Sequence, residues 1–425
     1  MRKIIKTDYL SRVEGEGGIY VEIKDSKIVK LQLNIFEAPR FFESFLVGRH
    51  YNDAPDFTAR ICGICPVAYL MSSVHAIEKI FDAKIDEPIR QLRRLLYASE
   101  WLSSHALHVY LLHGPDFYGI ESAWADKNYI EIAKRGLAFK NLGNRITSVI
   151  GGRSIHPVSV KVGGFYMAPD KKDLTGFLPE LEKAFEDSLA GIKWASSLRF
   201  NVFETEMEYI SLSHQCEYPM NEGKVISNKG IDLSMERFLD AVQEYQVSYS
   251  SSLHSGIKMG KTLSPYFTGP LARVNLNHDR LPEEILEVIK ESGVKLPIKN
   301  LQMSIIARSI EISYAIYELL RTIKNYEKPE KPYAEFELRS GKAAWITEAP
   351  RGMLIHAYDL DEKGCIKKCT IIPPTSQNLF HIERSVYEFV QSNIAKPADY
   401  LKSECEKIIR SYDPCISCST HVVRV

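Results

Sequence analysis

Two Cys-x-x-Cys pairs, placed at opposite ends of the chain, constrain its fold more than any other feature. Cys62 and Cys65 form the first pair, and Cys415 and Cys418 form the second. Two residues between cysteines allow both thiolates of one turn to bind the same metal. If the two pairs act together, the fold must bring the two ends of a 425-residue chain to one point.

The spacing of the cysteines leaves three kinds of metal site open. Four thiolates are soft ligands that suit zinc, iron or nickel. A structural zinc site usually has its pairs close in sequence and stabilises a small domain, whereas this chain is long enough to form a core of its own. The closely grouped cysteines of ferredoxins are missing. A catalytic metal site is favoured, and the spacing by itself does not decide among the three.

The composition excludes several other classes of protein. The 54 Lys and Arg residues balance 54 Asp and Glu residues, so nothing indicates nucleic acid or an anionic membrane as a partner. No apolar run approaches the roughly 18 residues that span a bilayer. The segment Met1–Ser11 lacks the apolar core of a secretory signal. We therefore expect a cytoplasmic protein without a membrane anchor.

The hydrophobic pattern predicts a mainly α-helical protein with peripheral β ribbons, an α+β fold. Alternating apolar residues predict a β ribbon over about 19–36, a short strand within 155–164 and a second β region over about 335–375. Helical periodicity is found over 88–114, 173–197, 234–250, 301–324 and 397–410. No repeat or low-complexity linker interrupts the chain, so we expect residues 1–425 to form one integrated domain around a central bundle of long helices.

Short motifs surround the cysteines and occur elsewhere along the chain. They are Arg12–Gly15 (RVEG), Arg60–Pro66 (RICGICP), Glu348–Gly352 (EAPRG) and Asp413–His421 (DPCISCSTH). With these motifs in this order, the chain resembles the large subunits of [NiFe] hydrogenases over nearly its whole length. The resemblance implies the large-subunit hydrogenase fold and the reversible conversion of H2 into protons and electrons.

The resemblance also implies a dinuclear nickel–iron centre held by the four cysteines. Cys62 and Cys415 match the terminal nickel ligands of the family. Cys65 and Cys418 match the thiolates that bridge nickel and iron. The iron of this family carries one CO and two cyanide ligands, which separate maturation proteins install.

Four further residues match positions around that centre. Glu14 matches the first proton acceptor, which lies near a terminal nickel cysteine. Arg351 would lie above the open metal site, where it could polarise bound H2. Asp116 and Asp413 match the carboxylates that hold this arginine in place.

A second metal and a processing step follow from the same resemblance. Glu43 and His421 match the positions that bind a structural divalent cation, usually Mg2+. In most relatives a maturation endopeptidase cuts after the matching histidine, which would release residues 422–425 here. We expect this cleavage to close the metal site.

The implied partners are other subunits that carry electrons. The chain has no evident cluster-binding cysteines beyond the two pairs, so an iron–sulfur small subunit must accept the electrons. The segment Glu217–Gly223 looks closest to the cytosolic bidirectional branch coupled to NAD(P)H, in which a further iron–sulfur subunit plus a flavin subunit complete a heterotetramer. Some members of this branch also reduce sulfur or polysulfide. Two alternatives are an H2 sensor with the same metals and a metal-free scaffold related to a respiratory-complex subunit, whose members lack the cysteine pairs.

Overall fold

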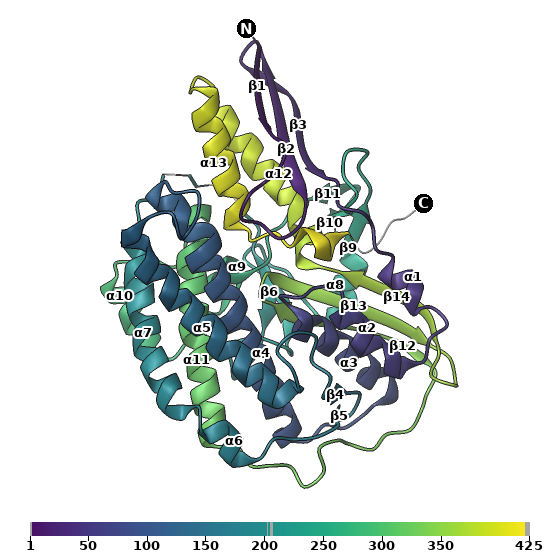
Figure 1. The fold of residues 1–425 in the computed structure, drawn as a ribbon. Helices are drawn as coiled ribbons and strands as arrows, with labels where there is room; N and C mark the ends of the chain where they lie inside the picture. Colours follow the sequence, from purple (N-terminus) through teal and green to yellow (C-terminus); the bar gives the residue numbers. More distant parts are fainter. Residues whose placement is uncertain (1, 202, 205–206, 421–425) are drawn as a thin grey trace.

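A bundle of long helices forms the centre of the molecule. The computed structural model describes residues 2–201, 203–204 and 207–420. The bundle consists of α4 (Glu87–Leu107), α5 (Lys127–Gly151), α7 (Leu178–Ser196) and α11 (Ser304–Lys324) (Figure 1). Helix α4 packs between α5 and α11, and α11 packs against α7 on its other side. The expected mainly helical α+β fold with a central bundle is confirmed.

Local sequence explains the two helices at the middle of this bundle. Helix α4 begins after Asp86 with Pro88 in its first turn, where proline lacks only an N–H that would have no partner within the helix. It continues into a π-helical segment, His108–His113, and then a 3-10 turn, Gly114–Tyr118. Helix α11 is buried over most of its length because other helices surround it. The helices predicted over 88–114 and 301–324 are confirmed.

Helix α5 is a long helix that the periodicity did not reveal. It contains glycines in its interior, and glycine lowers helix propensity by about 1 kcal/mol relative to alanine. Close packing explains why they are there. A Cβ atom on Gly143 would lie 2.5 Å from the carbonyl oxygen of Ser99 in α4, and one on Gly136 would lie 2.3 Å from Cβ of Tyr110. The glycines therefore allow α5 to approach its neighbours closely.

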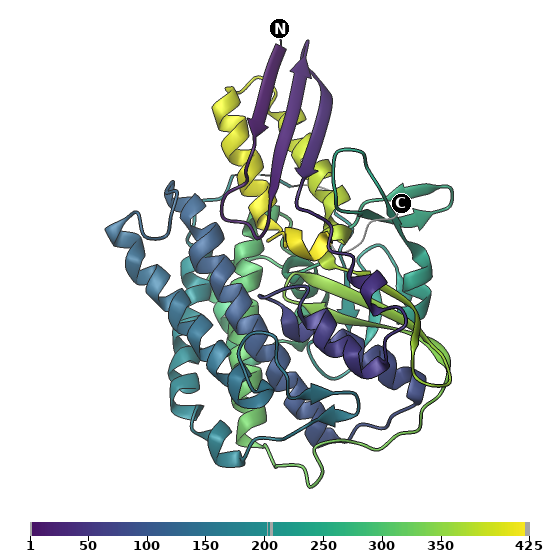
Figure 2. The same cartoon turned by 45° about the vertical axis from the view of Figure 1, so that its right-hand side comes forward.

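Two antiparallel sheets correspond to the predicted β regions. The first consists of β1 (Arg2–Thr7), β2 (Gly17–Lys24) and β3 (Lys27–Ile35), and extends from the body beside α12 (Pro374–Ser392) and α13 (Ala398–Ser411) (Figure 2). The second consists of β12 (Gly341–Ala349), β13 (Gly352–Leu360) and β14 (Ile366–Ile372). Helix α3 (Pro66–Phe81) packs on β12 and β13. The tight turn between β12 and β13 carries Arg351.

The helix expected over 234–250 is wrong in its second half. Helix α8 ends at Ala241, and the chain continues as β9 (Val242–Tyr245), which pairs antiparallel with β10 (His254–Met259). Val242 and Glu244 are buried on one face of β9, while Gln243 is exposed. Pairing with a neighbouring strand has overridden the local preference. The region over 173–197 is also divided, into α6 (Lys171–Thr175) and α7.

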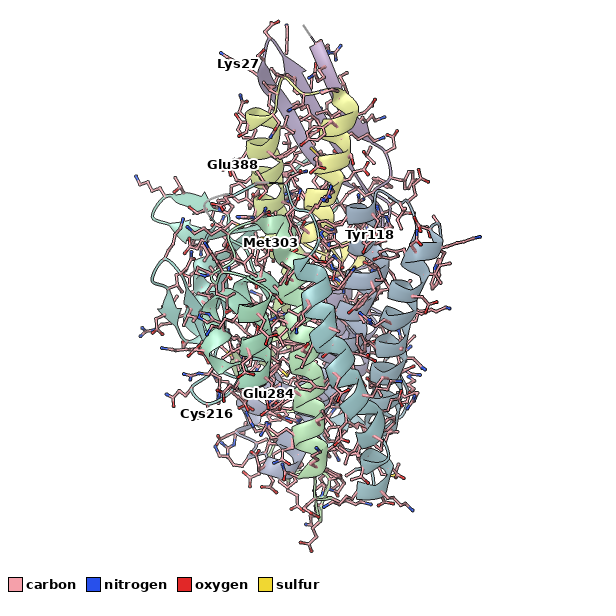
Figure 3. All side chains as sticks on the ribbon, turned by 90° about the vertical axis from the view of Figure 1, so that its left-hand side faces the viewer. Lys27, Tyr118, Cys216, Glu284, Met303 and Glu388 are labelled. Carbon is pink, nitrogen blue, oxygen red and sulfur yellow. The ribbon has the colours of Figure 1, made fainter. Side chains whose placement is uncertain are left out.

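The remaining elements are short and connect these layers. They are α1 (Phe42–Leu46), α2 (Ala54–Ala59), β4 (Val160–Lys161), β5 (Gly164–Phe165), β6 (Ile210–Ser213), β7 (Lys224–Ser227), β8 (Asp232–Leu233), α8 (Met235–Ala241), β11 (Thr262–Ser264), α9 (Pro270–Asn277), α10 (Glu283–Glu291) and α14 (Ile416–Ser419). One hydrophobic core includes Ile5 near the start of the chain, the central helices and Cys418 near its end. Side chains fill the space between the helices (Figure 3). None of the helices in the described residues is long and apolar enough to cross a membrane.

Candidate metal centre

The fold brings the two cysteine pairs together, as we expected for a shared metal site. The four Sγ atoms of Cys62, Cys65, Cys415 and Cys418 all lie within 4.8 Å of one another, and all four residues are buried. The contacts pair one cysteine from each turn. The Cys62 and Cys415 sulfurs are 3.5 Å apart, and the Cys65 and Cys418 sulfurs are 3.7 Å apart.

The first cysteine turn is held by the start of helix α3. Cys65 is the residue that precedes this helix, and Pro66 is in its first turn, where proline is favoured. The buried carboxylate of Glu100 accepts hydrogen bonds from the backbone N–H groups of Val67 at 2.6 Å and Ala68 at 3.1 Å. An acidic group at a helix N-terminus is stabilising because it pairs with free N–H donors. Glu100 thus anchors the helix whose first turn positions Cys65.

The second cysteine turn is held by two segments from elsewhere in the chain. The Cys415 N–H donates to Oγ1 of Thr375 at 3.0 Å, at the start of α12. The Ile416 N–H donates to the backbone carbonyl of Glu14 at 2.9 Å, and Glu14 forms an isolated β-bridge with Cys415. The N-terminal RVEG motif therefore lies directly against the C-terminal cysteine pair.

Arg40 connects the two turns, and the sequence patterns assigned it no role. Its Nη2 donates to the carbonyl of Ile61 at 2.8 Å, just before Cys62, and also to the carbonyl of Ser417, between the second pair. Its backbone N–H donates to the carbonyl of Thr420 at 2.9 Å. The available signal was its place three residues before Glu43, which the resemblance predicts as a ligand of Mg2+.

The electrostatics of the four thiols favour a bound cation. Hydrogen bonds from Cys415, Cys418 and Cys65 lower the pKa of the Cys62 thiol well below its ordinary value. Burial raises the pKa of the Cys415 thiol well above its ordinary value, and the neighbouring cysteines raise it further. One thiolate is therefore stabilised by its neighbours, but several together would repel one another. A metal cation removes this repulsion because it coordinates the thiolates directly.

Glu14 contacts the second cysteine turn with its side chain. The Cys415 thiol donates to Oε2 of Glu14 at 3.1 Å, and the Ser417 N–H donates to the same oxygen at 3.1 Å. The Ser417 hydroxyl donates to the other oxygen of Glu14. The same hydroxyl lies 3.4 Å from Oε2 of Glu37. Glu14 thus occupies the expected place beside a cysteine sulfur, and Ser417 and Glu37 continue the polar contacts away from it.

Arg351 and Asp413 form a buried ion pair beside the cysteines. Arg351 Nε donates to the backbone carbonyl of Asp413 at 2.9 Å, and Nη2 donates to Oδ1 of Asp413 at 3.2 Å. Burial opposes the charge of Arg351, but Asp413 and the charges of Cys415, Cys65 and Cys62 together raise its pKa well above the ordinary value. The guanidinium therefore stays charged beside the thiolates.

The prediction that Asp116 holds Arg351 is wrong in the described structure. Asp116 pairs with Arg410, whose Nε lies 2.7 Å from Oδ2 and whose Nη2 lies 2.9 Å from Oδ1. Arg12 binds the same carboxylate, with 2.5 Å between its Nη2 and Oδ1. The reason is the position of the 3-10 turn after α4, which directs Asp116 toward α13 and the N-terminal segment. Asp116 joins these elements instead of contacting Arg351.

Only part of the predicted Mg2+ site can be compared with the structure. Glu43, in α1, accepts a hydrogen bond through Oε1 from the N–H of Ile371 at 2.6 Å. His421 and the 422–425 tail lie outside the described residues. The predicted site and the predicted cleavage therefore stay predictions.

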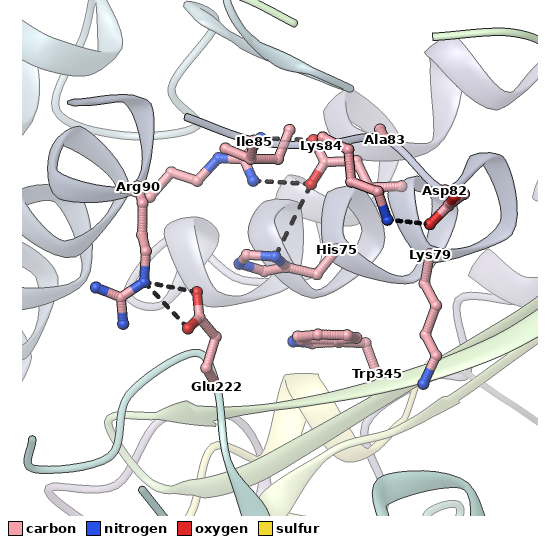
Figure 4. Close-up of a pocket in the computed structure, with 11 residues that line it drawn as sticks. His75, Lys79, Asp82, Ala83, Lys84, Ile85, Arg90, Glu222 and Trp345 are labelled. Atoms are coloured by element: carbon pink, nitrogen blue, oxygen red, sulfur yellow. Dashed lines mark hydrogen bonds and ion pairs between the residues drawn. The ribbon is translucent and has the colours of Figure 1, made fainter. Parts of the chain in front are cut away.

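A surface cavity of about 360 Å³ lies apart from the cysteines, among α3, the start of α4 and β12 (Figure 4). Trp345 forms part of its wall. Its charged groups pair with one another, because Arg90 donates to Glu222 at 3.0 Å and Lys84 contacts Asp82 at 2.5 Å. None of the predicted site residues lines it. The cysteine cluster is therefore the better candidate for the chemistry of this chain.

The residues of the cluster fit a bound metal centre. Four sulfur ligands within 4.8 Å of one another could hold nickel and iron, or a single tetrahedral ion. Arg351 Nη1 is buried and makes no hydrogen bond to any described residue. The charges of the cysteines nevertheless raise the pKa of this side chain. A buried N–H donor normally has a partner, so this one is consistent with a group bound at the cysteines.

Comparison with known proteins identifies relatives along the whole chain. The model of a family described as nickel-dependent hydrogenase matches residues 40–135 and 262–421. The alpha subunit of sulfhydrogenase 2 from Pyrococcus furiosus is 33% identical, over 99% of this chain and 100% of that protein. The alpha subunit of sulfhydrogenase 1 from the same organism is 32% identical, over 99% and 98%. A crystal structure of an NAD+-reducing [NiFe]-hydrogenase in the H2-reduced state is 23% identical and superposes with a TM-score of 0.86, covering 99% of both chains.

Proposed function

This chain belongs to the nickel-dependent hydrogenase family as a large subunit, and on that premise we propose that it catalyses the reversible cleavage of H2 into protons and electrons. It is an oxidoreductase of the [NiFe] hydrogenase type. The observation that carries the proposal is the meeting of Cys62, Cys65, Cys415 and Cys418 in one buried cluster.

The pairing of the sulfurs supports distinct roles for the cysteines. Cys65 and Cys418, whose sulfurs are 3.7 Å apart, would bridge nickel and iron, and Cys62 and Cys415, whose sulfurs are 3.5 Å apart, would be the terminal nickel ligands. One CO and two cyanides would complete the coordination of the iron. When bound, this centre supplies the redox chemistry that splits H2 heterolytically.

Glu14 would receive the proton that leaves the centre. Its Oε2 accepts a hydrogen bond from the Cys415 thiol at 3.1 Å, which is within reach for proton transfer from that sulfur. The Ser417 hydroxyl, in contact with both Glu14 and Glu37, offers the next acceptor. The carboxylate of Glu14 thus connects the buried sulfur to polar groups farther out.

Arg351 would hold positive charge over the cysteines. Its Nε and Nη2 bind Asp413, whereas Nη1 makes no hydrogen bond to the described residues, and its delocalised charge is not easily lost. Asp413 would hold this arginine in place, because both the backbone carbonyl and the carboxylate of Asp413 accept hydrogen bonds from the guanidinium. Asp116 would act at a distance, because it fixes α13 through Arg410 and so supports the segment that leads to Asp413.

Electrons would leave through a partner protein. Relatives are named as single subunits of larger hydrogenases, which supports a first acceptor in the form of an iron–sulfur small subunit. A further iron–sulfur subunit plus a flavin subunit would pass the electrons to NAD(P)+ in the cytoplasm, as the NAD+-reducing structural neighbour suggests. Sulfur or polysulfide could be a second acceptor, given the sulfhydrogenase relatives.

Two further features of the family would complete the enzyme. Mg2+ would bind near Glu43 and His421, where carboxylate oxygen suits a hard cation. A maturation endopeptidase would remove residues 422–425. Mass spectrometry of the active enzyme checks the second point, and an intact Val425 would contradict it.

Metal analysis and infrared spectroscopy of the purified complex test the function. We expect equal amounts of nickel and iron, absorption bands of metal-bound CO and cyanide, and H2-dependent reduction of NAD(P)+. Cys415→Ser should lose nickel, because it removes one terminal thiolate, whereas Cys216→Ser changes an exposed cysteine outside the cluster and should not. Slow turnover with intact metals would favour an H2 sensor. Absence of both metals would favour the scaffold alternative, although its relatives lack the cysteine pairs.

A further inference from the structure

Arg273, on helix α9, is a buried arginine whose hydrogen-bonding capacity is completely used. Its side chain is 0% exposed. Nε and Nη2 donate to the two carboxylate oxygens of Glu311 in α11, each at 2.7 Å. Nη1 donates to Oε2 of Glu348 at 2.8 Å. The remaining N–H groups donate to backbone carbonyls, from Nη1 to Ala349 at 2.9 Å and from Nη2 to Pro350 at 3.0 Å.

These contacts converge on the residues just before Arg351. Glu348, Ala349 and Pro350 form the end of β12 and the start of the turn into β13. Three groups of this segment accept from Arg273, which is itself anchored to the helical bundle through Glu311. The turn that carries Arg351 is therefore connected to the bundle by one guanidinium.

Other contacts hold Glu348 from the remaining sides. Its N–H donates to the carbonyl of Met220 at 2.6 Å, and its Oε1 accepts from the N–H of Leu212 at 2.7 Å. Its carbonyl accepts from Nε1 of Trp101 at 3.0 Å, and the Trp101 ring lies 4.3 Å from the Arg273 guanidinium carbon. A cation over an aromatic face is stabilised by the ring. The orientation of Arg273 is thus fixed both by its hydrogen bonds and by the Trp101 ring.

The two residues before helix α9 also contact the chain around Arg351. A Cβ atom on Gly269, the residue before this helix, would lie 2.9 Å from the carbonyl oxygen of Arg351. The N–H of Met353 donates to Oγ1 of Thr268 at 3.0 Å. The segment that leads into the helix of Arg273 therefore contacts the chain at Arg351 and just after it.

We propose that Arg273 is a positioning residue, which fixes the Arg351 guanidinium beside the cysteine cluster by holding the three residues that precede it. This inference rests on the proposed function, because it concerns the reaction at the same centre. The Arg351 side chain is bonded only to Asp413 among the described residues, so its place depends on the backbone that presents it. Displacement of a catalytic group by about 1 Å can lower a rate by about 10²-fold.

Replacement of Arg273 by lysine distinguishes the effect of its positive charge from the effect of its hydrogen-bond geometry. The ammonium keeps the positive charge between Glu311 and Glu348, so no buried carboxylate loses its only cation. It has three donors instead of five, and it lacks the planar fork that reaches two carbonyls and two carboxylates together. Arg273→Lys should therefore release the turn while it preserves the charge balance.

Arg94→Lys is the matched control. Arg94 is 2% exposed and binds the carboxylates of Glu318 and Glu217, each at 2.7 Å, in the same helical bundle. Its hydrogen bonds to the described residues do not reach the turn that carries Arg351. Both substitutions exchange a buried guanidinium for an ammonium between two carboxylates, so they should lower thermal stability to a similar degree.

The experiment compares both variants in the assembled, metal-loaded complex. We expect Arg273→Lys to lower H2 turnover about 10²-fold with nickel and iron retained, and Arg94→Lys to leave turnover unchanged. Crystal structures supply a readout independent of activity: the bond between Arg351 Nε and the Asp413 carbonyl should lengthen in Arg273→Lys and persist in Arg94→Lys. Equal turnover in the two variants, or an unmoved Arg351 in Arg273→Lys, overturns the proposal.

A double substitution tests whether Arg273 acts through Arg351. In an Arg351→Lys background, Arg273→Lys should cause little further loss of turnover, because the group that it positions is already changed. A full additional loss in that background contradicts the proposal. If Arg273→Lys does not assemble, Glu348→Gln replaces it, since it weakens one contact to Nη1 and leaves the Glu311 pair. A wild-type complex without nickel, iron or H2 turnover would instead refute the proposed function, so the two failures are distinct.

Discussion

Replacement of Gly15 by alanine should separate Glu14 from the cysteine cluster. Gly15 has a φ of +89°, and an added Cβ would lie 2.7 Å from Cβ of Ile416 and 3.0 Å from the backbone nitrogen of Ser417. It would also lie 2.5 Å from Oε2 of Glu37. The Glu37 side chain can turn away, but Ile416 and Ser417 belong to the turn between the second cysteines. The two backbones must therefore move apart.

The size of the effect follows from these distances. Carbon atoms in contact are normally about 3.5–4.0 Å apart, so relief of the contact with Ile416 requires a movement of about 1 Å. The hydrogen bond between Cys415 Sγ and Glu14 Oε2, now 3.1 Å, would lengthen beyond bonding distance. A displacement of that size corresponds to a loss of about 10²-fold in turnover. The left-handed backbone adds about 1–2 kcal/mol of destabilisation for alanine, and the crowding adds about 1–3 kcal/mol.

Gly230→Ala is the control, because it introduces the same kind of backbone strain but no steric crowding around the added Cβ atom. Gly230 has a φ of +98°, and nothing lies within 4 Å of an added Cβ. It belongs to the turn between β7 and β8, strands that pack in a different hydrophobic cluster from the cysteines. We expect this variant to lose stability through the backbone term alone and to keep its turnover. The assays are H2-dependent dye reduction and thermal denaturation of the metal-loaded complex.

Two results would refute this reasoning. One is a Gly15→Ala enzyme with the turnover of Gly230→Ala, which would show that the approach of Glu14 to Cys415 does not limit catalysis. The other is a structure of Gly15→Ala in which the Glu14 contacts are unchanged. Loss of nickel in Gly15→Ala would indicate that the segment supports the cysteine turn as well as the proton acceptor, and metal analysis detects it.

Three further substitutions have outcomes that follow from the site and its surroundings. Glu14→Gln should lower H2 turnover by about 10²–10⁴-fold, because the amide cannot take the proton from Cys415. The infrared bands of CO and cyanide should be retained. Unchanged turnover would exclude Glu14 as the proton acceptor. Asp116→Asn should destabilise the complex by about 3–5 kcal/mol in denaturation experiments, since it removes the carboxylate that pairs with both Arg12 and the buried Arg410. A change in turnover without loss of stability would contradict this structural role. Burial lowers the pKa of His381 to about 3. Its unfolded value is about 6.5, so the folded state binds fewer protons, and stability should fall by about 2 kcal/mol from pH 7 to pH 5. His381→Gln should remove this part of the pH dependence, and an equal dependence in both proteins would show that His381 is protonated in the folded state.

Local patterns were enough to predict several elements of the fold. The alternation over 19–36 and 335–375 corresponds to β2, β3 and the sheet β12–β14. The apolar stripes of α4 and α11 identified the centre of the bundle. Elements whose sequence agrees with their structure at short range are the ones that periodicity detects. Helix α5 and strand β9 were not found because glycine packing against α4 and pairing with β10 depend on neighbours.

The candidate site divides in the same way. The four cysteines, Glu14, Arg351 and Asp413 were predicted from the family resemblance that the short motifs carry, and the structure places these residues together. The partner of Asp116 could not be predicted, because Arg410 and Arg351 are equally suitable cations in sequence and only the direction of the turn after α4 selects between them. The same holds for Arg40 and Arg273, because part of their contacts are with backbone carbonyl groups, which carry no sequence signature.

The sequence by itself determined the chemistry of this protein: which side chains can bind soft metals, which can carry protons, and which segments form helices or ribbons. Only the tertiary structure decided which of those groups meet. Ligand type and local periodicity are properties of single residues and their near neighbours. A hydrogen bond or ion pair requires atoms to lie within about 3 Å, and for Glu14 and Cys415 that proximity depends on the packing of everything between them.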